Sequence, residues 1–392
     1  MERLRYLEPI PAEQLLQNRF HDFPPAEVPG FTDLKPLTCS YNSLIYEGVS
    51  SAMGRVAVKV DCPSLIKMCT QAAQEEYTDF TIDKALRVSS EHLSEENAAT
   101  AQRRNNSMSG LVSHFDESVL PEQWQLLPVL LRGDVLCHGL RGSARRSIHV
   151  PRFEDNEKYE TSTLVRVQPW SADLHDPNRL SLSTGYAERG YGNWSPINYE
   201  DYKKLTRNLA MPGGPNVRNR YELEELAMLQ GSQHLQNFLL RLETNPALAR
   251  STNRFLERFA EYIDDTQTIL DVISYDNVIF NPECIMVDAL YVTDDQVVLA
   301  SFRALQQLAL REVPTPKDAN HLFNYLNVVR GMSIVAIACK SDVKFGLTLP
   351  EGSDPEVLLD EIVRLDRAKH GLPKGEPRVR SIEPSRAKIA LK

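Results

Sequence analysis

Two oxygen-bearing side chains, those of Asn277 and Asp288, flank a pair of short apolar segments in the second half of the chain. The segments are Val278–Phe280 and Ile285–Val287, and the residues 281–283 between them, Asn-Pro-Glu, are typical of a turn. The pattern predicts a β-hairpin, and a hairpin this short brings the residues at its two ends together. Hard cations such as Mg²⁺ prefer oxygen ligands, completed by the phosphates of a substrate. The hairpin therefore predicts a metal site.

A lysine in the first half of the chain stands in the run Val56-Ala57-Val58-Lys59, within a segment that alternates as a β-strand does. Alternation sends Ala57 and Lys59 to one face, where the ammonium could reach a phosphate and the small alanine leaves room for a base. Gly48 and Gly54 flank the preceding loop, whose small residues let backbone N–H groups approach an anion. The pattern predicts a phosphate-binding region.

These features resemble the protein-kinase-like superfamily, which includes atypical kinases and enzymes similar to the aminoglycoside phosphotransferases. In that family a strand lysine in a V-A-I-K setting contacts the ATP phosphates and pairs with a glutamate on the next helix. The resemblance implies these roles for Lys59 and for Glu75 or Glu76, which lie on a helix expected after Pro63. The family also has a glycine loop between its first two strands, a role implied for the residues from Gly48 to Gly54.

In the same family an asparagine and the aspartate of D-F-G hold Mg²⁺, and the resemblance implies this role for Asn277 and Asp288. A catalytic aspartate normally precedes that asparagine by five residues, in H-R-D-x-x-x-x-N. Val272 occupies that position here, so a loop longer by one residue would make Asp271 the catalytic base, with Asp276 as the alternative. Gln168, at the end of an apolar strand, is implied to contact the adenine where the two lobes join.

The sequence departs from the family in three places. The spacing G-x-G-x-x-G is absent between residues 48 and 54, Ala289 replaces the aromatic residue of D-F-G, and no His-Arg pair precedes Asp271. The departures leave a second interpretation open, in which the protein is an inactive pseudokinase or a helical scaffold that acts through protein–protein contacts. A third is transfer of a nucleotidyl group by the same fold.

The elements that would position these residues are rich in strands first and rich in helices second, which predicts an α+β fold of the bilobal kinase type. Two stretches lack a clear period, and we expect a polar surface excursion over residues 88–118 and a long irregular connection over residues 173–219. The expected divisions are an extended N-terminal arm (1–37), a nucleotide-binding N-lobe (38–170), a helical C-lobe with the metal-binding hairpin (171–368) and a basic flexible tail (369–392).

Bulk properties narrow the class of protein. A chain of 392 residues with a net charge of −9 is long enough for two lobes and lacks the basic surface that nucleic-acid binding normally needs. No signal-peptide core is evident at the N-terminus, and no apolar run of membrane-spanning length stands out, so we expect a cytoplasmic protein without a membrane contact. The expected function is transfer of the ATP γ-phosphate, with Mg²⁺, to the hydroxyl group of an unidentified protein or small molecule.

Overall fold

The computed structural model divides the chain into two compact units. The first contains Met1–Val112 and Leu120–Ser171, and the second contains Ser113–Val119 and Ala172–Lys392. The last crossing between the units, after Ser171, is next to the lobe boundary expected at residue 170. The structure describes residues 5–6, 26–39, 43–61, 82–132, 135–141, 144–150, 158–172, 176, 178–184, 199–212, 217–273, 277–290 and 296–369.

A six-stranded antiparallel sheet forms the centre of the first unit, with the strand order β2-β6-β9-β5-β4-β3. The strands expected next to the loop of residues 48–54 are confirmed, as is the apolar strand that ends near Gln168. The strands are β2 (Ala26–Glu27), β3 (Phe31–Cys39), β4 (Ser43–Ser50), β5 (Gly54–Asp61), β6 (Gln123–Arg132) and β9 (Lys158–Pro169).

The sheet curls until it is nearly closed, because its two edge strands follow one another in the chain. β2 pairs with β6 at one edge, β3 pairs with β4 at the other, and only residues 28–30 connect them. Gly30 has a φ of 87°, a left-handed conformation that favours glycine, and the Phe31 N–H donates to the Val28 carbonyl over 3.2 Å. The sheet therefore begins within the stretch expected to be an extended arm.

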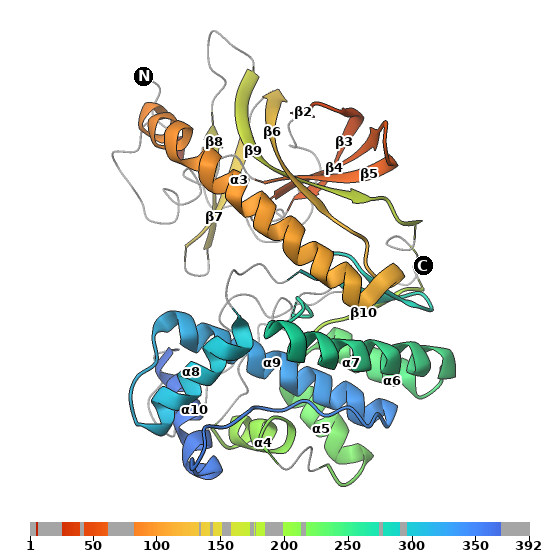
Figure 1. The fold of residues 1–392 in the computed structure, drawn as a ribbon, viewed down its shortest axis with the longest axis vertical. Helices are drawn as coiled ribbons and strands as arrows, with labels where there is room; N and C mark the ends of the chain where they lie inside the picture. Colours follow the sequence, from red (N-terminus) through yellow and green to blue (C-terminus); the bar gives the residue numbers. More distant parts are fainter. Residues whose placement is uncertain are drawn as a thin grey trace. The chain divides into compact units, whose positions relative to one another are not determined.

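A long helix, α3 (Ile82–Phe115), occupies most of the predicted polar excursion, so that expectation was wrong. Its inward-facing residues recur at helical spacing, and Ala101, Met108 and Leu111 are buried. Ala101 forms a small core cluster with Trp124 of β6 and Leu164 of β9, so α3 covers this part of the sheet (Figure 1). The remaining side chains are mostly polar, which hid the helix in the sequence.

A smaller three-stranded sheet is formed largely by the segment between β6 and β9, with the order β1-β8-β7. Its strands are β1 (Arg5–Tyr6), β7 (Val135–Arg141) and β8 (Ala144–Val150). The arginines at 141, 145 and 146 that form a basic patch in the sequence belong to this β7–β8 hairpin. The chain is thus a mixture of α and β elements, with the strands concentrated in the first unit.

The second unit is mainly helical, as expected, and contains one small sheet with the order β10-β11-β12. β10 and the whole of α4 lie inside the connection expected to be irregular over residues 173–219, which corrects that prediction. The elements are η1 (Asp116–Ser118), β10 (Leu180–Leu182), α4 (Tyr199–Leu209), α5 (Arg220–Gln230), α6 (Gln233–Leu242), α7 (Pro246–Thr266), β11 (Val278–Phe280), β12 (Cys284–Met286), α8 (Val297–Ala309), α9 (Pro316–Cys339) and α10 (Pro355–Lys369).

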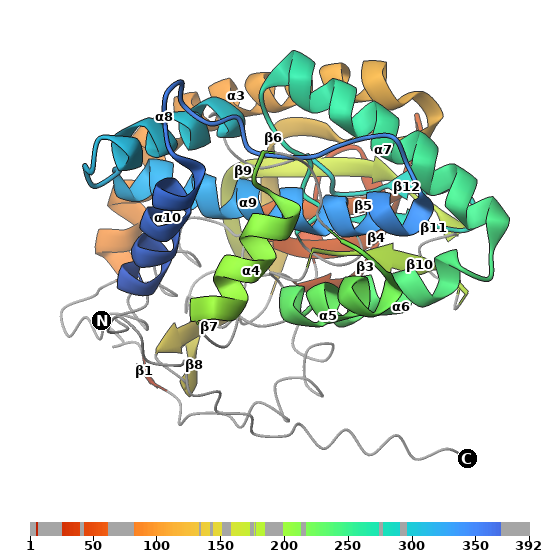
Figure 2. The same cartoon turned by 90° about the horizontal axis from the view of Figure 1, so that it is seen from below.

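The helix α9 forms the core of this unit and contacts α4, α5, α6, α7 and α8 (Figure 2). In the described part of the chain, α9 alone is long and apolar enough to cross a membrane by length and composition, contrary to our expectation. However, 78% of the most apolar 18-residue stretch of α9 is buried inside the protein, as in the central helix of a globular domain.

Local signals set the helix boundaries. The stretch of helical periodicity from residue 220 to residue 242 is split in two, because Gly231 adopts a left-handed φ of 75° and the Ser232 side chain caps the next helix. At the start of α7, the Asn245 side chain accepts hydrogen bonds from the N–H groups of Ala247 and Leu248, and Pro246 occupies the first turn.

Candidate functional site

The predicted hairpin is present in the second unit and brings Asn277 and Asp288 to its open end. β11 and β12 pair from Val278 with Met286 to Phe280 with Cys284. Beyond the last pair, the Val287 N–H donates to the Asn277 carbonyl over 2.8 Å, so the ladder continues to the residue that precedes Asp288. The hairpin prediction is therefore confirmed, with the second strand beginning and ending one residue earlier than expected.

A second backbone connection places Asp271 beside the same end of the hairpin. The Asp271 N–H donates to the Ala289 carbonyl over 2.8 Å, and Leu270 pairs with Leu290. The Asn277 side-chain amide then donates to the Asp271 carbonyl over 3.0 Å. The segments that carry the three predicted residues are thus joined to one another by hydrogen bonds.

These hydrogen-bonded segments form a frame around Asp271, Asn277 and Asp288, and tightly packed side chains surround it. Phe280 lies between Phe238 of α6 and Phe255 of α7, with ring centroids 5.1 and 6.1 Å away. The residues after β10 hold the loop that follows Asp271, because the Thr184 N–H donates to the Val272 carbonyl and the Ser183 hydroxyl donates to the Ile273 carbonyl. Apolar packing and backbone hydrogen bonds therefore fix the main chain around the predicted metal ligands.

The side chains of Asp271, Asn277 and Asp288 are half-buried rather than sealed inside the unit. Because the Asn277 NH₂ group donates to a carbonyl, its side-chain oxygen is the atom suited to a cation. The part of the chain that the structure describes contains no cluster of three or more His, Cys, Asp or Glu residues that could hold a metal ion. A cation bound by Asn277 and Asp288 would need further oxygens from a substrate, which is how Mg²⁺ usually binds with nucleotides.

Lys59 lies in the middle of the sheet in the first unit, at a position where β5 pairs with β9. It is only 6% exposed, and its ammonium donates to the Glu122 carboxylate over 2.5 Å. Glu122 is also buried and directly precedes β6. The expected partners, Glu75 and Glu76, lie outside the described residues, as does Asp276.

The turn bounded by Gly48 and Gly54 differs from the loop that the family resemblance implies. The strands β3, β4 and β5 form a continuous antiparallel run, so Lys59 lies on its third strand and the turn connects the second strand to the third. The loop between the first two strands falls at residues 40–42, outside the described residues.

Both glycines also have local reasons to be glycine. A Cβ atom on Gly48 would lie 2.6 Å from Cδ2 of Leu34, and Gly54 has a φ of 73°. Their presence is explained by packing and by turn geometry without a phosphate.

Gln168, expected near the adenine, is a buried residue of β9 that pairs with Ala57. Its side-chain amide donates to the Leu120 carbonyl over 2.9 Å. Trp170, two residues later, donates its N–H to the Arg55 carbonyl and lies under the Arg55 guanidinium at 4.3 Å. The side chain of Gln168 therefore has a structural role within the sheet.

Comparison of the chain with family models, curated proteins and solved structures finds no match.

Sequence reasoning missed Glu122 and the polar group around it. Arg166, opposite Lys59 on β9, packs over the Trp124 ring at 5.0 Å and lies 3.9 Å from the Asp61 carboxylate. Arg166 and Trp124 are buried, and Arg104 of α3 approaches the same ring at 5.9 Å. Alternation along each strand predicts which residues share a face but not which strands pair, and the segment that contains Glu122 has no periodic pattern.

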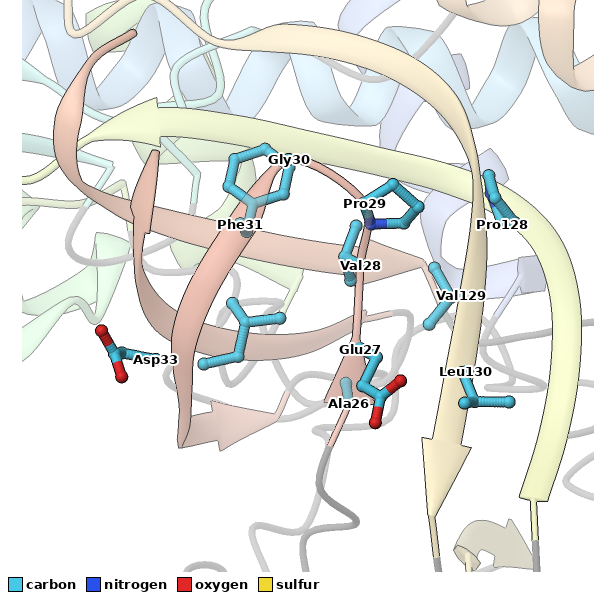
Figure 3. Close-up of a pocket in the computed structure, with 11 residues that line it drawn as sticks. Ala26, Glu27, Val28, Pro29, Gly30, Phe31, Asp33, Pro128, Val129 and Leu130 are labelled. Atoms are coloured by element: carbon cyan, nitrogen blue, oxygen red, sulfur yellow. The ribbon is translucent and has the colours of Figure 1, made fainter. Parts of the chain in front are cut away.

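A cavity of about 530 Å³ lies elsewhere in the first unit, beside the turn between β2 and β3 (Figure 3). Most of the residues that line it are apolar, among them Val28, Phe31 and Val129, and Glu27 and Asp33 are acidic. None of the predicted site residues lines it. The cavity lies between the β2–β3 turn and β6, whose pairing with β2 covers only two residues.

Proposed function

We propose that the protein is an atypical kinase-like phosphotransferase that moves the γ-phosphate of ATP, with Mg²⁺, to a hydroxyl group. The observation that carries the proposal is the hydrogen-bonded frame around Asp271, Asn277 and Asp288 in the second unit. Phosphoryl transfer asks a protein mainly to position groups and to neutralise charge. A rigid main chain that presents oxygen donors on half-buried side chains suits this task.

Each residue has a definite role in the proposal. Asp288 and the Asn277 side-chain oxygen bind Mg²⁺, which neutralises charge on the phosphates. Asp271 orients the acceptor hydroxyl and accepts its proton as the phosphoryl group is transferred. Lys59 contacts the α- and β-phosphates, in the same role as the strand lysine of the family. The acceptor is a protein or small-molecule hydroxyl.

The proposal is tested first by the thermal stability of the full-length protein with ATP and Mg²⁺. We expect millimolar ATP to raise the melting temperature only when Mg²⁺ is present, since a ligand that binds the native state stabilises it. Asp288→Asn should abolish the increase. Glu283→Gln, at the closed end of the same hairpin, removes a carboxylate away from Asp288 and should preserve it. No increase in the wild-type protein would refute the proposal.

Catalysis is tested separately from binding. Release of phosphate from ATP reports transfer to water and can be measured without the natural acceptor. We expect Asp271→Asn to lose this activity while it retains the stabilisation by Mg²⁺ and ATP. If the wild-type protein binds ATP but releases no phosphate and labels no acceptor, it is an inactive pseudokinase. If mass spectrometry of a labelled acceptor shows an added nucleotide, the reaction is nucleotidyl transfer.

A further inference from the structure

We propose that the buried Glu122 positions Lys59 for the nucleotide, a role that the family resemblance implied for Glu75 or Glu76. This inference rests on the proposed function. It also means that the lysine–glutamate pair is built into the sheet and forms without the movement of a helix.

The first reason is the geometry of the pair. The Lys59 ammonium and the Glu122 carboxylate are 2.5 Å apart, and their side chains are only 7% and 1% exposed. Opposite charges this close and this well shielded from water interact far more strongly than a surface ion pair does. The ammonium is thereby kept charged and held in one direction, which is what a phosphate-binding lysine requires.

The second reason is the way in which Glu122 is held. The next residue, Gln123, pairs with Val167 of β9, so Glu122 continues directly into the sheet. On its other side, the Gln168 amide donates to the Leu120 carbonyl. Both supports come from β9, which also pairs with the strand that carries Lys59. The two charged residues are therefore fixed through one shared strand.

The third reason is the composition of the helix that packs on this part of the sheet. Asn105 of α3 exchanges hydrogen bonds with both backbone groups of Trp124, with lengths of 2.8 and 2.9 Å. Residues 98–115 of α3, whose side chains the structure describes, contain neither aspartate nor glutamate. This part of the helix has no carboxylate to offer Lys59.

The consequence concerns regulation. In protein kinases the lysine pairs with a helix glutamate, and positioning of that helix switches the pair on and off. A pair carried by β5 and by the residue before β6 stays assembled with or without nucleotide. We therefore expect nucleotide affinity to be constitutive and to depend on Glu122.

The test compares Glu122→Gln with the matched variants Glu75→Gln and Glu76→Gln in the full-length protein. We expect Glu122→Gln to weaken Mg²⁺–ATP binding about tenfold or more, as loss of a charged hydrogen bond does. The other two variants should weaken binding much less than Glu122→Gln does. Glu122→Asp, which keeps the charge, should recover part of the affinity. A loss caused by Glu75→Gln or Glu76→Gln and not by Glu122→Gln would overturn the inference.

A second measurement separates this inference from the proposed function, because it needs no nucleotide. An amine-reactive reagent labels lysines that it can reach, and peptide mass spectrometry reports the extent of labelling at Lys59, which is buried while Glu122 holds it. We expect labelling to rise in folded Glu122→Gln and Glu122→Asp protein, and more in the former. Unchanged labelling in both variants would show that Glu122 does not control Lys59. If the wild-type protein binds no ATP, the proposed function fails while the labelling still tests the pair.

Discussion

In the first unit, Lys59 is held by a side-chain ion pair inside the sheet, whereas the main chain holds Asp271, Asn277 and Asp288 in the second unit. The ammonium of Lys59 depends on the Glu122 carboxylate at 2.5 Å. The predicted metal ligands depend on hydrogen bonds such as that from the Asp271 N–H to the Ala289 carbonyl.

This difference between a side-chain ion pair and backbone hydrogen bonds decides which substitutions report on function and which report on folding. When two buried side chains hold each other, removal of either one leaves a charge without its partner in a poorly solvated place. When the backbone forms the frame, a side chain can be replaced and the frame persists. Substitutions of Asp271 and Asp288 are therefore the clearer probes of chemistry, and substitutions of Lys59 must be accompanied by a test of stability.

The largest expected effect comes from removal of one member of the buried pair. Lys59→Met should lower the free energy of unfolding by about 3–5 kcal/mol, because Glu122 then remains buried without the ammonium that neutralises it. The double substitution Lys59→Met/Glu122→Leu should be much closer to the wild type, since apolar residues of similar volume replace both charges. Urea unfolding of the wild type, Lys59→Met, Glu122→Leu and the double variant measures the coupling between the two side chains. A loss below about 1 kcal/mol in the single variant would contradict the shielded pair.

The next effect tests how firmly the frame of the second unit is supported. Gly331 of α9 packs against Thr184, and a Cβ atom there would lie 2.5 Å from the threonine Cγ2. Thr184 cannot easily give way, because it donates to the Val272 carbonyl and its hydroxyl accepts a hydrogen bond from Asn327. Gly331→Ala should therefore lower the free energy of unfolding by about 1–3 kcal/mol through overpacking.

A glycine in the first unit provides the matched control for this prediction. Gly110 lies within α3, and a Cβ atom on it would meet nothing within 4 Å. Alanine favours a helix more than glycine does, so Gly110→Ala should raise the stability by about 0.5–1 kcal/mol. Opposite signs for the two substitutions, measured by thermal or urea unfolding, confirm that contact with Thr184 and not helix propensity decides the outcome at Gly331.

Parts of the molecule with a strong periodic signal could be predicted from the sequence. The hairpin of residues 278–286 was predicted because two apolar runs flank a turn, and β4 and β5 were predicted from their alternation. The helices after residue 219 follow from apolar residues three and four positions apart. Local patterns of this kind identify an element before its neighbours are known.

The remaining parts depend on contacts between distant residues. Helix α3 has too few apolar residues for its period to stand out, and it is stabilised by contacts with Trp124 and Leu164 that the local sequence does not reveal. Glu122 lies 63 residues from Lys59 in the chain, and only the pairing of β5 and β6 with β9 brings them together. The place of the Gly48–Gly54 turn in the sheet could not be predicted either. The strand β3, which makes this turn the connection between the second and third strands, lies in a proline-rich stretch without clear alternation.

A smaller effect distinguishes the two ends of the hairpin in the second unit. Asn277→Ala and Asn281→Ala each remove one side-chain hydrogen bond, from the Asn277 amide to the Asp271 carbonyl and from the Asn281 amide to Asp176. Each should lower the free energy of unfolding by about 0.5–1.5 kcal/mol. Only Asn277→Ala should also remove the Mg²⁺-dependent stabilisation by ATP. Equal loss of that stabilisation in both variants would argue that Asn277 acts through the hairpin and not as a ligand.

The smallest effect concerns exposed charges, at the opposite extreme from the buried pair. Lys203 of α4 donates to Asp360 of α10 over 2.5 Å and lies 3.7 Å from Glu356, and these carboxylates are about half exposed. The hydrogen bond from Lys203 lowers the pKa of Asp360, and the hydrogen bond from Arg207 lowers the pKa of Glu356.

A lowered carboxyl pKa in the folded state contributes stability above the unfolded value, and the contribution is lost as the pH falls through the folded value. For Asp360, whose ordinary pKa is 3.8, this window lies on the acid side of about pH 5. Lys203→Met should lower the stability at neutral pH by less than about 1 kcal/mol, because water and salt screen the pair. It should also flatten the acid side of a stability–pH curve measured by urea unfolding.

Lys204→Met removes the neighbouring charge, which pairs with Glu225 and not with α10, and should keep the wild-type slope. The same slope in both variants would mean that Lys203 does not hold α10.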